Sequence, residues 1–157
     1  MSRAINFIRP PRTDENLARM VVSVAEATQV DGIICITETG LLAQYLDRLS
    51  GHFRVIATTT NSETYDALKK AGLEVIRLPL HTADKYTQIR HAISVVLQSS
   101  SFSIGDLVVC AIGRDVYQEA GDLVVLTEGD PLVDEAQPRG VGAAQVDPSQ
   151  DTVRVHP

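Results

Sequence analysis

The sequence predicts an α/β domain built around a mainly parallel sheet, and two patterns carry this prediction. Short unbroken apolar runs, such as residues 33–36 and 107–112, are bounded by turn residues, which is typical of strands covered on both faces. Between these runs lie segments whose apolar residues recur at helical spacing. Helices and strands alternate four times along the chain, and this alternation indicates a layered α/β domain with right-handed crossovers.

Local signals mark where each element begins and ends. Thr13 or Asp14 can cap the first helix and Asp84 can cap the fourth, because their side-chain oxygens accept from free amides. Gly72 is expected to close the third helix in a left-handed conformation, and Pro79 ends the third strand. The helical repeats run around residues 17–27, 42–49, 65–71 and 89–97, and the predicted strands are 33–36, 55–57, 75–78, 107–112 and 122–126.

The last two predicted strands are separated only by residues 113–121, a loop too short for a crossover helix. They are expected to pair as a hairpin, so that the fifth strand runs antiparallel to the others. From residue 128 onward no periodicity survives, and this stretch holds four of the seven prolines. The sequence therefore predicts a folded domain over residues 1–127 and an extended or partly disordered, linker-like tail over residues 128–157.

Composition excludes several classes of function. The net charge of −6, the scattered basic residues and the 4% of aromatic residues argue against nucleic-acid binding, which needs a basic stripe or stacking platforms. No apolar run approaches a membrane span, and the first residues do not resemble a secretory signal. Cys35 and Cys110 are too few for a disulfide framework or a zinc site and are expected to be buried, inert thiols. We expect a cytoplasmic domain whose partner is a small molecule or a protein.

The candidate ligand site lies where the predicted strands end. In open parallel sheets, ligands bind outside the carboxyl ends of the strands, and here residues 37–40 and 58–61 are rich in hydroxyls and lead into helix N-termini, which attract anions. The alternative is that Thr39 and Asn61 only cap their own helices. The candidate ligand-binding residues are Thr37, Thr39, Gly40, Thr59, Asn61, His81 and Arg114.

A catalytic centre is not predicted. The four histidines are spread along the chain, and no nucleophile–base pair, close pair of carboxylates or metal-ligand spacing stands out. The glycine patterns of dinucleotide-binding and P-loop proteins are absent. We therefore expect no catalytic residues, no metal and no cofactor.

Residues 31–46, DGIICITETGLLAQYL, and residues 54–61, RVIATTTN, resemble the C-terminal domain of pyruvate kinase. The similarity continues through residues 67–75 and 104–113 and covers roughly residues 15–127. It implies a three-layer sandwich with a five-stranded sheet of order 3-2-1-4-5, its strand 5 antiparallel. It also implies that Thr37, Thr39 and Gly40 hold a phosphate, as this loop does in allosteric pyruvate kinases, although residues 114–121 lack the Gly-Ser-Gly character of the family's effector loop.

Residues 78–93 and 105–110 also resemble the N-terminal half of archaeal-type diadenylate cyclases, whose cyclase motifs do not occur here in context. Two functions are therefore open. The first is a non-catalytic regulatory domain that binds a small anionic or phosphorylated ligand. The alternative is an oligomerisation or accessory domain of a cyclase-like protein, working as a homo-oligomer or with a fused or associated catalytic domain.

Overall fold

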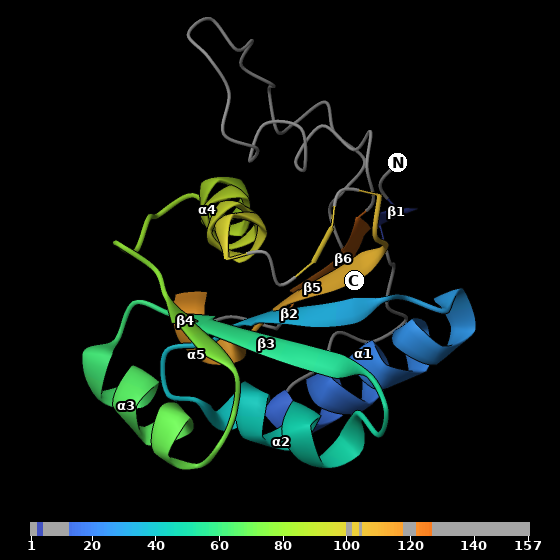
Figure 1. Ribbon diagram of the computed structural model, residues 1–157, viewed down its shortest axis with the longest axis horizontal. Helices are drawn as coiled ribbons and strands as arrows, with labels where there is room; N and C mark the ends of the chain where they lie inside the picture. Colours follow the sequence, from blue (N-terminus) through green and yellow to red (C-terminus); the bar gives the residue numbers. More distant parts are fainter. Residues whose placement is uncertain (1–2, 5–12, 100–101, 104, 118–121, 127–157) are drawn as a thin grey trace, which may run out of the picture.

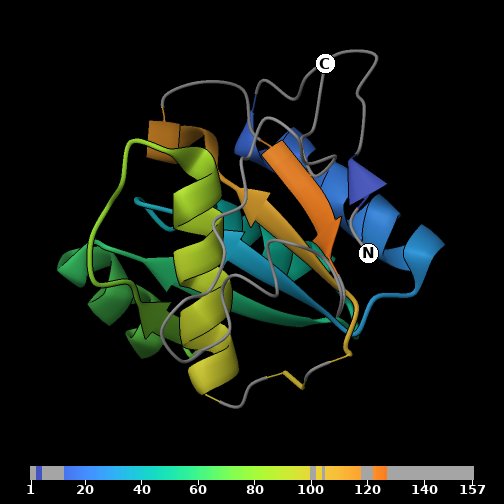
Figure 2. The same ribbon diagram turned by 90° about the horizontal axis from the view of Figure 1, so that it is seen from above.

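The computed structural model describes residues 3–4, 13–99, 102–103, 105–117 and 122–126 of the chain. Helices cover both faces of one central sheet (Figure 1). Helix α4 (Lys85–Gln98) lies over one face, and α1 (Asp14–Thr28), α2 (Leu41–Leu49) and α3 (Ser62–Lys70) lie on the other. Figure 2 shows α4 running across the sheet from above. The alternation of helices and strands read from the sequence is confirmed as an α/β fold.

The sheet has the strand order β1-β6-β5-β2-β3-β4. Four neighbouring strands are parallel, and β6 pairs antiparallel with β5 and with β1. The bounds are β1 (Arg3–Ala4), β2 (Gly32–Ile36), β3 (Arg54–Thr59), β4 (Val75–Arg77), β5 (Val108–Ile112) and β6 (Asp122–Leu126). The predicted count of five strands is wrong, because β1 adds a sixth. A two-residue strand is too short for any hydrophobic periodicity to reveal it.

Side-chain caps fix the starts of three helices. The hydroxyl of Thr13, and not the carboxylate of Asp14, accepts from the amide of Asn16 at 3.1 Å at the start of α1. Asp84 caps α4 as predicted, and Gly72 has the expected positive φ, +89°, after α3. A further short helix, α5 (Arg114–Tyr117), lies in the segment that was predicted to be a loop. The predicted domain end at residue 127 and the tail over 128–157 lie outside the described residues.

The core lies on both faces of the two central strands. Every residue of β2 and of β5 is buried, which explains why both segments are unbroken apolar runs in the sequence. Leu17, Leu42 and Leu46 pack against one face from α1 and α2, and Ile89 and Ile93 approach from α4. Of the helices that the structure describes, none has the length and apolar character needed to cross a membrane.

Both cysteines are buried, free thiols. The register pairs Cys110 with Ile34 and Cys35 with Ala111, so the two side chains project from opposite faces of the sheet. Burial, followed by the negative charge of Asp115, raises the pKa of Cys35 well above its usual value. Burial alone raises the pKa of Cys110 to about 12. Neither thiol ionises near neutral pH.

We expect the folded chain to resist alkylation, because only an exposed thiolate reacts quickly. Iodoacetamide at neutral pH should modify neither cysteine of the native protein, and both should react once denaturant is added; intact-mass spectrometry reads the number of adducts. The single variants Cys35→Ala and Cys110→Ala assign each adduct to one strand. Rapid modification of the native protein would contradict the burial described here.

Candidate functional site

The loop of residues 37–40 joins β2 to α2 at the carboxyl edge of the sheet. Thr37 is fully buried, and its hydroxyl accepts from the amide of Gly40 at 2.9 Å. Gly40 has φ +87°, and a Cβ at this position would lie 3.2 Å from Leu68 and 3.3 Å from Thr64. Glycine is therefore required both for the left-handed conformation and for the close approach of α3. The loop folds tightly against the N-terminus of α2.

A carboxylate of the chain itself occupies this loop. The Oδ2 atom of Asp115, in α5, accepts from the amide of Thr39 at 2.8 Å and from its hydroxyl at 2.5 Å. The hydroxyl of Thr37 donates to the same oxygen at 3.2 Å. The other oxygen, Oδ1, is buried and has no hydrogen-bond partner among the residues that the structure describes. Three donors thus converge on one carboxylate oxygen of the chain itself.

Asp14 holds α5 from the other side. Its Oδ1 atom accepts from the amide of Arg114 at 3.1 Å, and the residue is only 7% exposed. Burial raises the pKa of Asp14, and the nearby charge of Asp115 adds to the rise, whereas the bond from the Arg114 amide opposes it. The Asp14 carboxyl group therefore holds its proton more tightly in the folded chain than in the unfolded chain. Above the raised pKa the ionised carboxylate lowers the free energy of unfolding, and this loss of stability disappears as the pH falls and the group becomes protonated.

We expect Asp14→Asn to raise the midpoint of thermal unfolding at neutral pH. The amide oxygen keeps an acceptor for Arg114 while the unfavourable buried charge is removed. The advantage over the unsubstituted chain should shrink as pH falls through the raised pKa of Asp14, because the native carboxyl then becomes neutral as well. Calorimetry across an acidic-to-neutral pH series measures this. Asp66→Asn, at an exposed position of α3, is the matched control, and an Asp14→Asn advantage that does not change with pH would contradict the assignment.

Hydroxyl groups connect the neighbouring loop of residues 58–61 and the start of α3 with the 37–40 loop. The Thr60 hydroxyl contacts the carboxylate of Glu38 at 2.8 and 2.9 Å, and the Thr64 hydroxyl donates to the carbonyl of Glu38 at 2.5 Å. Thr59 is buried and accepts from the amide of Asn61 at 3.1 Å. Asn61 in turn caps α3 through the amide of Thr64 at 3.0 Å. Asn61 therefore acts as a cap, which was the alternative reading of this residue.

A third contact links α5 to the loop that precedes α4. The ring of His81 lies 5.1 Å from the ring of Tyr117, centroid to centroid. The hydroxyl of Tyr117 donates to the carbonyl of Thr82 at 2.9 Å, and burial raises the pKa of this tyrosine. The fully buried Gln88 accepts from the amide of Thr82 at 2.8 Å. Through Asp115 and Tyr117, α5 thus bridges two of the loops at this edge.

The structure gathers three of the predicted residues around one point. Thr37 and Thr39 bind Asp115, and Gly40 binds Thr37. The other predicted residues have different contacts. Thr59 and Asn61 form hydrogen bonds within their own loop and at the start of α3. The ring of His81 lies beside that of Tyr117, and Arg114 is exposed while its backbone amide donates to Asp14. Sequence reasoning missed Asp115, although its position just after the fourth predicted strand placed it at the same edge.

This edge carries the carboxylates of Asp14, Glu38 and Asp115, so an added anion meets negative charge, and it reaches the donors of the 37–40 loop only if Asp115 moves away from them. Glu38 is engaged by Thr60 and Asp14 by Arg114. Among the residues that the structure describes, no group of three or more His, Cys, Asp or Glu side chains is placed to hold a metal ion. The chemistry available at the loop is hydrogen bonding to an oxyanion by an amide and two hydroxyls.

Comparisons with known proteins agree with this architecture. The family model described as "Pyruvate kinase, alpha/beta domain" matches residues 15–138. A crystal structure of a pyruvate kinase from Cryptosporidium parvum superposes with a TM-score of 0.59 and 24% identity, covering 74% of this chain and 23% of that one. A second structure, the Cryptosporidium parvum enzyme in complex with ADP, gives 0.58 and 24% identity over 76% of this chain and 24% of that one. A search of curated proteins gives no match. The chain spans about a quarter of the length of these pyruvate kinases.

Proposed function

Because the chain belongs to the family of the pyruvate kinase alpha/beta domain, we propose that it is a non-catalytic regulatory domain that binds a small anionic or phosphorylated ligand at the carboxyl ends of its strands. In pyruvate kinases this domain is not the catalytic one. The proposed ligand oxygen takes the position of Asp115 Oδ2 in the 37–40 loop. Asp115 is then the internal occupant that the ligand must displace.

The convergence of donors on Asp115 is the observation that carries this proposal. An amide and two hydroxyls already bind one carboxylate oxygen at 2.5–3.2 Å, and a phosphate oxygen accepts from the same groups. Thr39 is exposed, so the position can be reached from solvent. Glu38 does not compete, because its carboxylate binds Thr60.

Displacement of Asp115 predicts opposite effects for two variants. Asp115→Ala removes the competing charge, so inorganic phosphate or a sugar phosphate should bind more tightly and raise the melting temperature more than it does for the unsubstituted chain. Thr39→Ala removes a donor and should abolish the shift in both backgrounds. Thr28→Ala, at the far end of α1 where the hydroxyl donates to Val24, is the matched control. Differential scanning fluorimetry over a phosphate series measures these shifts. If Asp115→Ala binds no better than the unsubstituted chain, the proposal fails.

Exposed apolar side chains favour assembly as a second candidate function. Leu41 is 44% exposed at the start of α2, and Leu80 is 54% exposed in the loop before α4. In this second proposal the domain forms a homo-oligomer or docks on a separate catalytic domain. Light scattering after size exclusion should then show a dimer or a larger species, which the double variant Leu41→Glu, Leu80→Glu converts to monomer. A strictly monomeric parent chain would rule out the homo-oligomer.

A further inference from the structure

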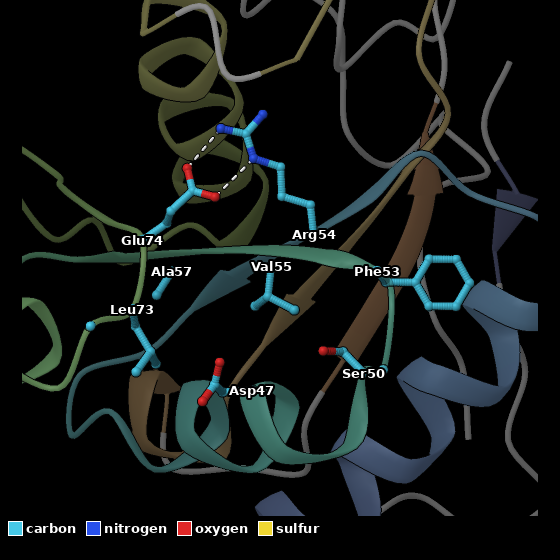
Figure 3. A pocket seen from close by; sticks show the side chains of 10 residues that line it. Asp47, Ser50, Phe53, Arg54, Val55, Ala57, Leu73 and Glu74 are labelled. Carbon is cyan, nitrogen blue, oxygen red and sulfur yellow. Dashed lines mark hydrogen bonds and ion pairs between the residues drawn. The ribbon is translucent and has the colours of Figure 1, made fainter.

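A hollow lies at the edge of the sheet opposite the 37–40 loop, beside the amino ends of β3 and β4 (Figure 3). Its volume is about 230 Å³, and it is bounded by the C-terminal half of α2, the start of β3 and the turn that enters β4. Pockets for drug-sized ligands span roughly 300–1,000 Å³, so this one suits a smaller molecule. Its aliphatic wall is formed by Val55, Ala57 and Leu73.

Ser50 places an unused hydroxyl in this hollow. The residue is only 6% exposed. Its backbone is fully engaged, since its amide donates to Leu46 at 2.8 Å and its carbonyl accepts from Phe53 at 3.2 Å. Among the described residues no group hydrogen-bonds to its hydroxyl, and Figure 3 shows the oxygen directed into the hollow. The oxygen is open to the hollow and is not among the sealed, unpaired polar atoms of the described residues, so a ligand atom can hydrogen-bond to it in place of solvent.

Asp47 provides a charge one turn earlier on α2. Its carboxylate points from the helix toward β3 (Figure 3) and forms no ion pair within the described part of the chain. The other charged residues at the rim neutralise each other, because Arg54 Nε and Nη2 donate to the two carboxylate oxygens of Glu74 at 2.8 and 2.7 Å. Figure 3 shows this pair on the other side of the β3 ribbon. The hollow therefore carries the negative charge of Asp47.

Two glycines are among the residues that line the hollow. Gly51 and Gly72 both line the hollow and have φ of +63° and +89°, and a Cβ built on either would meet no atom within 4 Å. Neither residue therefore contributes a side chain to the hollow, and the space beside each of them is open.

We propose that this hollow binds a small primary ammonium compound. The ammonium group donates to the carboxylate of Asp47 and to the hydroxyl of Ser50, and a short alkyl chain packs on Val55 and Leu73. A cation satisfies both polar groups at once, because an ammonium has three donors and a carboxylate only accepts. An anion would meet the charge of Asp47. The site is independent of the 37–40 loop, which lies at the opposite edge.

An NMR titration of the full chain with butylamine tests the proposal, with butanol and butyrate as the neutral and anionic analogues. Butylamine should shift the amide signals of Ser50, Gly51 and Leu73, and the two analogues should not. Asp47→Asn should weaken binding by about tenfold or more, as expected for the loss of a charge-assisted hydrogen bond. Ser50→Ala should weaken it less.

Asp66→Asn, on the exposed side of α3, should bind butylamine as the unsubstituted chain does. The proposal is overturned if butanol shifts the same amides equally, if Asp47→Asn binds as tightly as the parent, or if butylamine causes no localised shift. Inorganic phosphate is added in a separate titration and reports on the 37–40 loop. The absence of butylamine binding at the hollow and the absence of phosphate binding at the loop are therefore distinguished from each other.

Discussion

Leu42→Ala is expected to lower the free energy of unfolding by about 2–5 kcal/mol, the cost of truncating a fully buried leucine. Leu42 lies in the first turn of α2 with no exposed surface. Its Cβ atom sits 3.6 Å from the position that a Cβ on Gly113 would occupy, so it fills the space between the helix and the end of β5. The nearby strands β2 and β5 are fully buried and cannot easily close the resulting cavity. Urea denaturation followed by circular dichroism measures the change.

The adjacent residue is a matched control. Leu41 has the same chemistry and the same helix, but it is 44% exposed, and Leu41→Ala should change the stability by no more than about 0.5 kcal/mol. Equal losses for the two variants would show that α2 does not bury the face assigned to it here. If Leu41→Ala instead changed the mass of the particle in light scattering, Leu41 would belong to an interface between copies.

The elements that the sequence predicted well are those with strong local signals. Residues 33–36 and 107–112 are continuous apolar runs because β2 and β5 are buried on both faces. Caps at Thr13, Asn61 and Asp84 follow from the hydrogen-bonding capacity of those residues. In contrast, β1 has two residues and α5 has four. Elements this short contain less than two repeats of their own period, so no pattern reveals them.

The closeness of Thr37, Thr39 and Gly40 was predictable, but the approach of Asp115 to them was not. These three residues were singled out because hydroxyls and a glycine follow a buried strand at the edge where ligands bind in open parallel sheets. Asp115 is 76 residues from Thr39 in the sequence. The two meet because β2 and β5 pair with Ile36 opposite Ile112, and this register is set by the packing of the whole sheet. The hollow beside Ser50 had no sequence signal either, because its lining comes from three separate elements.

Gly40→Ala is expected to cost about 1–3 kcal/mol of stability and to disturb the 37–40 loop. The left-handed conformation at φ +87° is one source of the cost, worth about 1–2 kcal/mol for a residue with a Cβ. The new methyl group would also lie 3.2 Å from Leu68 and 3.3 Å from Thr64, so α3 must move away. Because Gly40 donates to Thr37, which donates to Asp115, the amide signals of Thr39 and Asp115 should shift together in NMR spectra.

The variant Gly72→Ala distinguishes the two causes of the stability loss expected for Gly40→Ala, which are backbone strain and steric contact with α3. Gly72 has nearly the same φ, +89°, but a Cβ there would meet nothing within 4 Å, so its substitution carries the conformational strain without the steric contact. Gly40→Ala should therefore be the more destabilising of the two in urea denaturation. It should also weaken any phosphate response of the Asp115→Ala background, whereas Gly72→Ala should leave that response intact. If the two variants proved equally costly and neither affected Thr39, the close packing of α3 on this loop would not be what holds its donors in place.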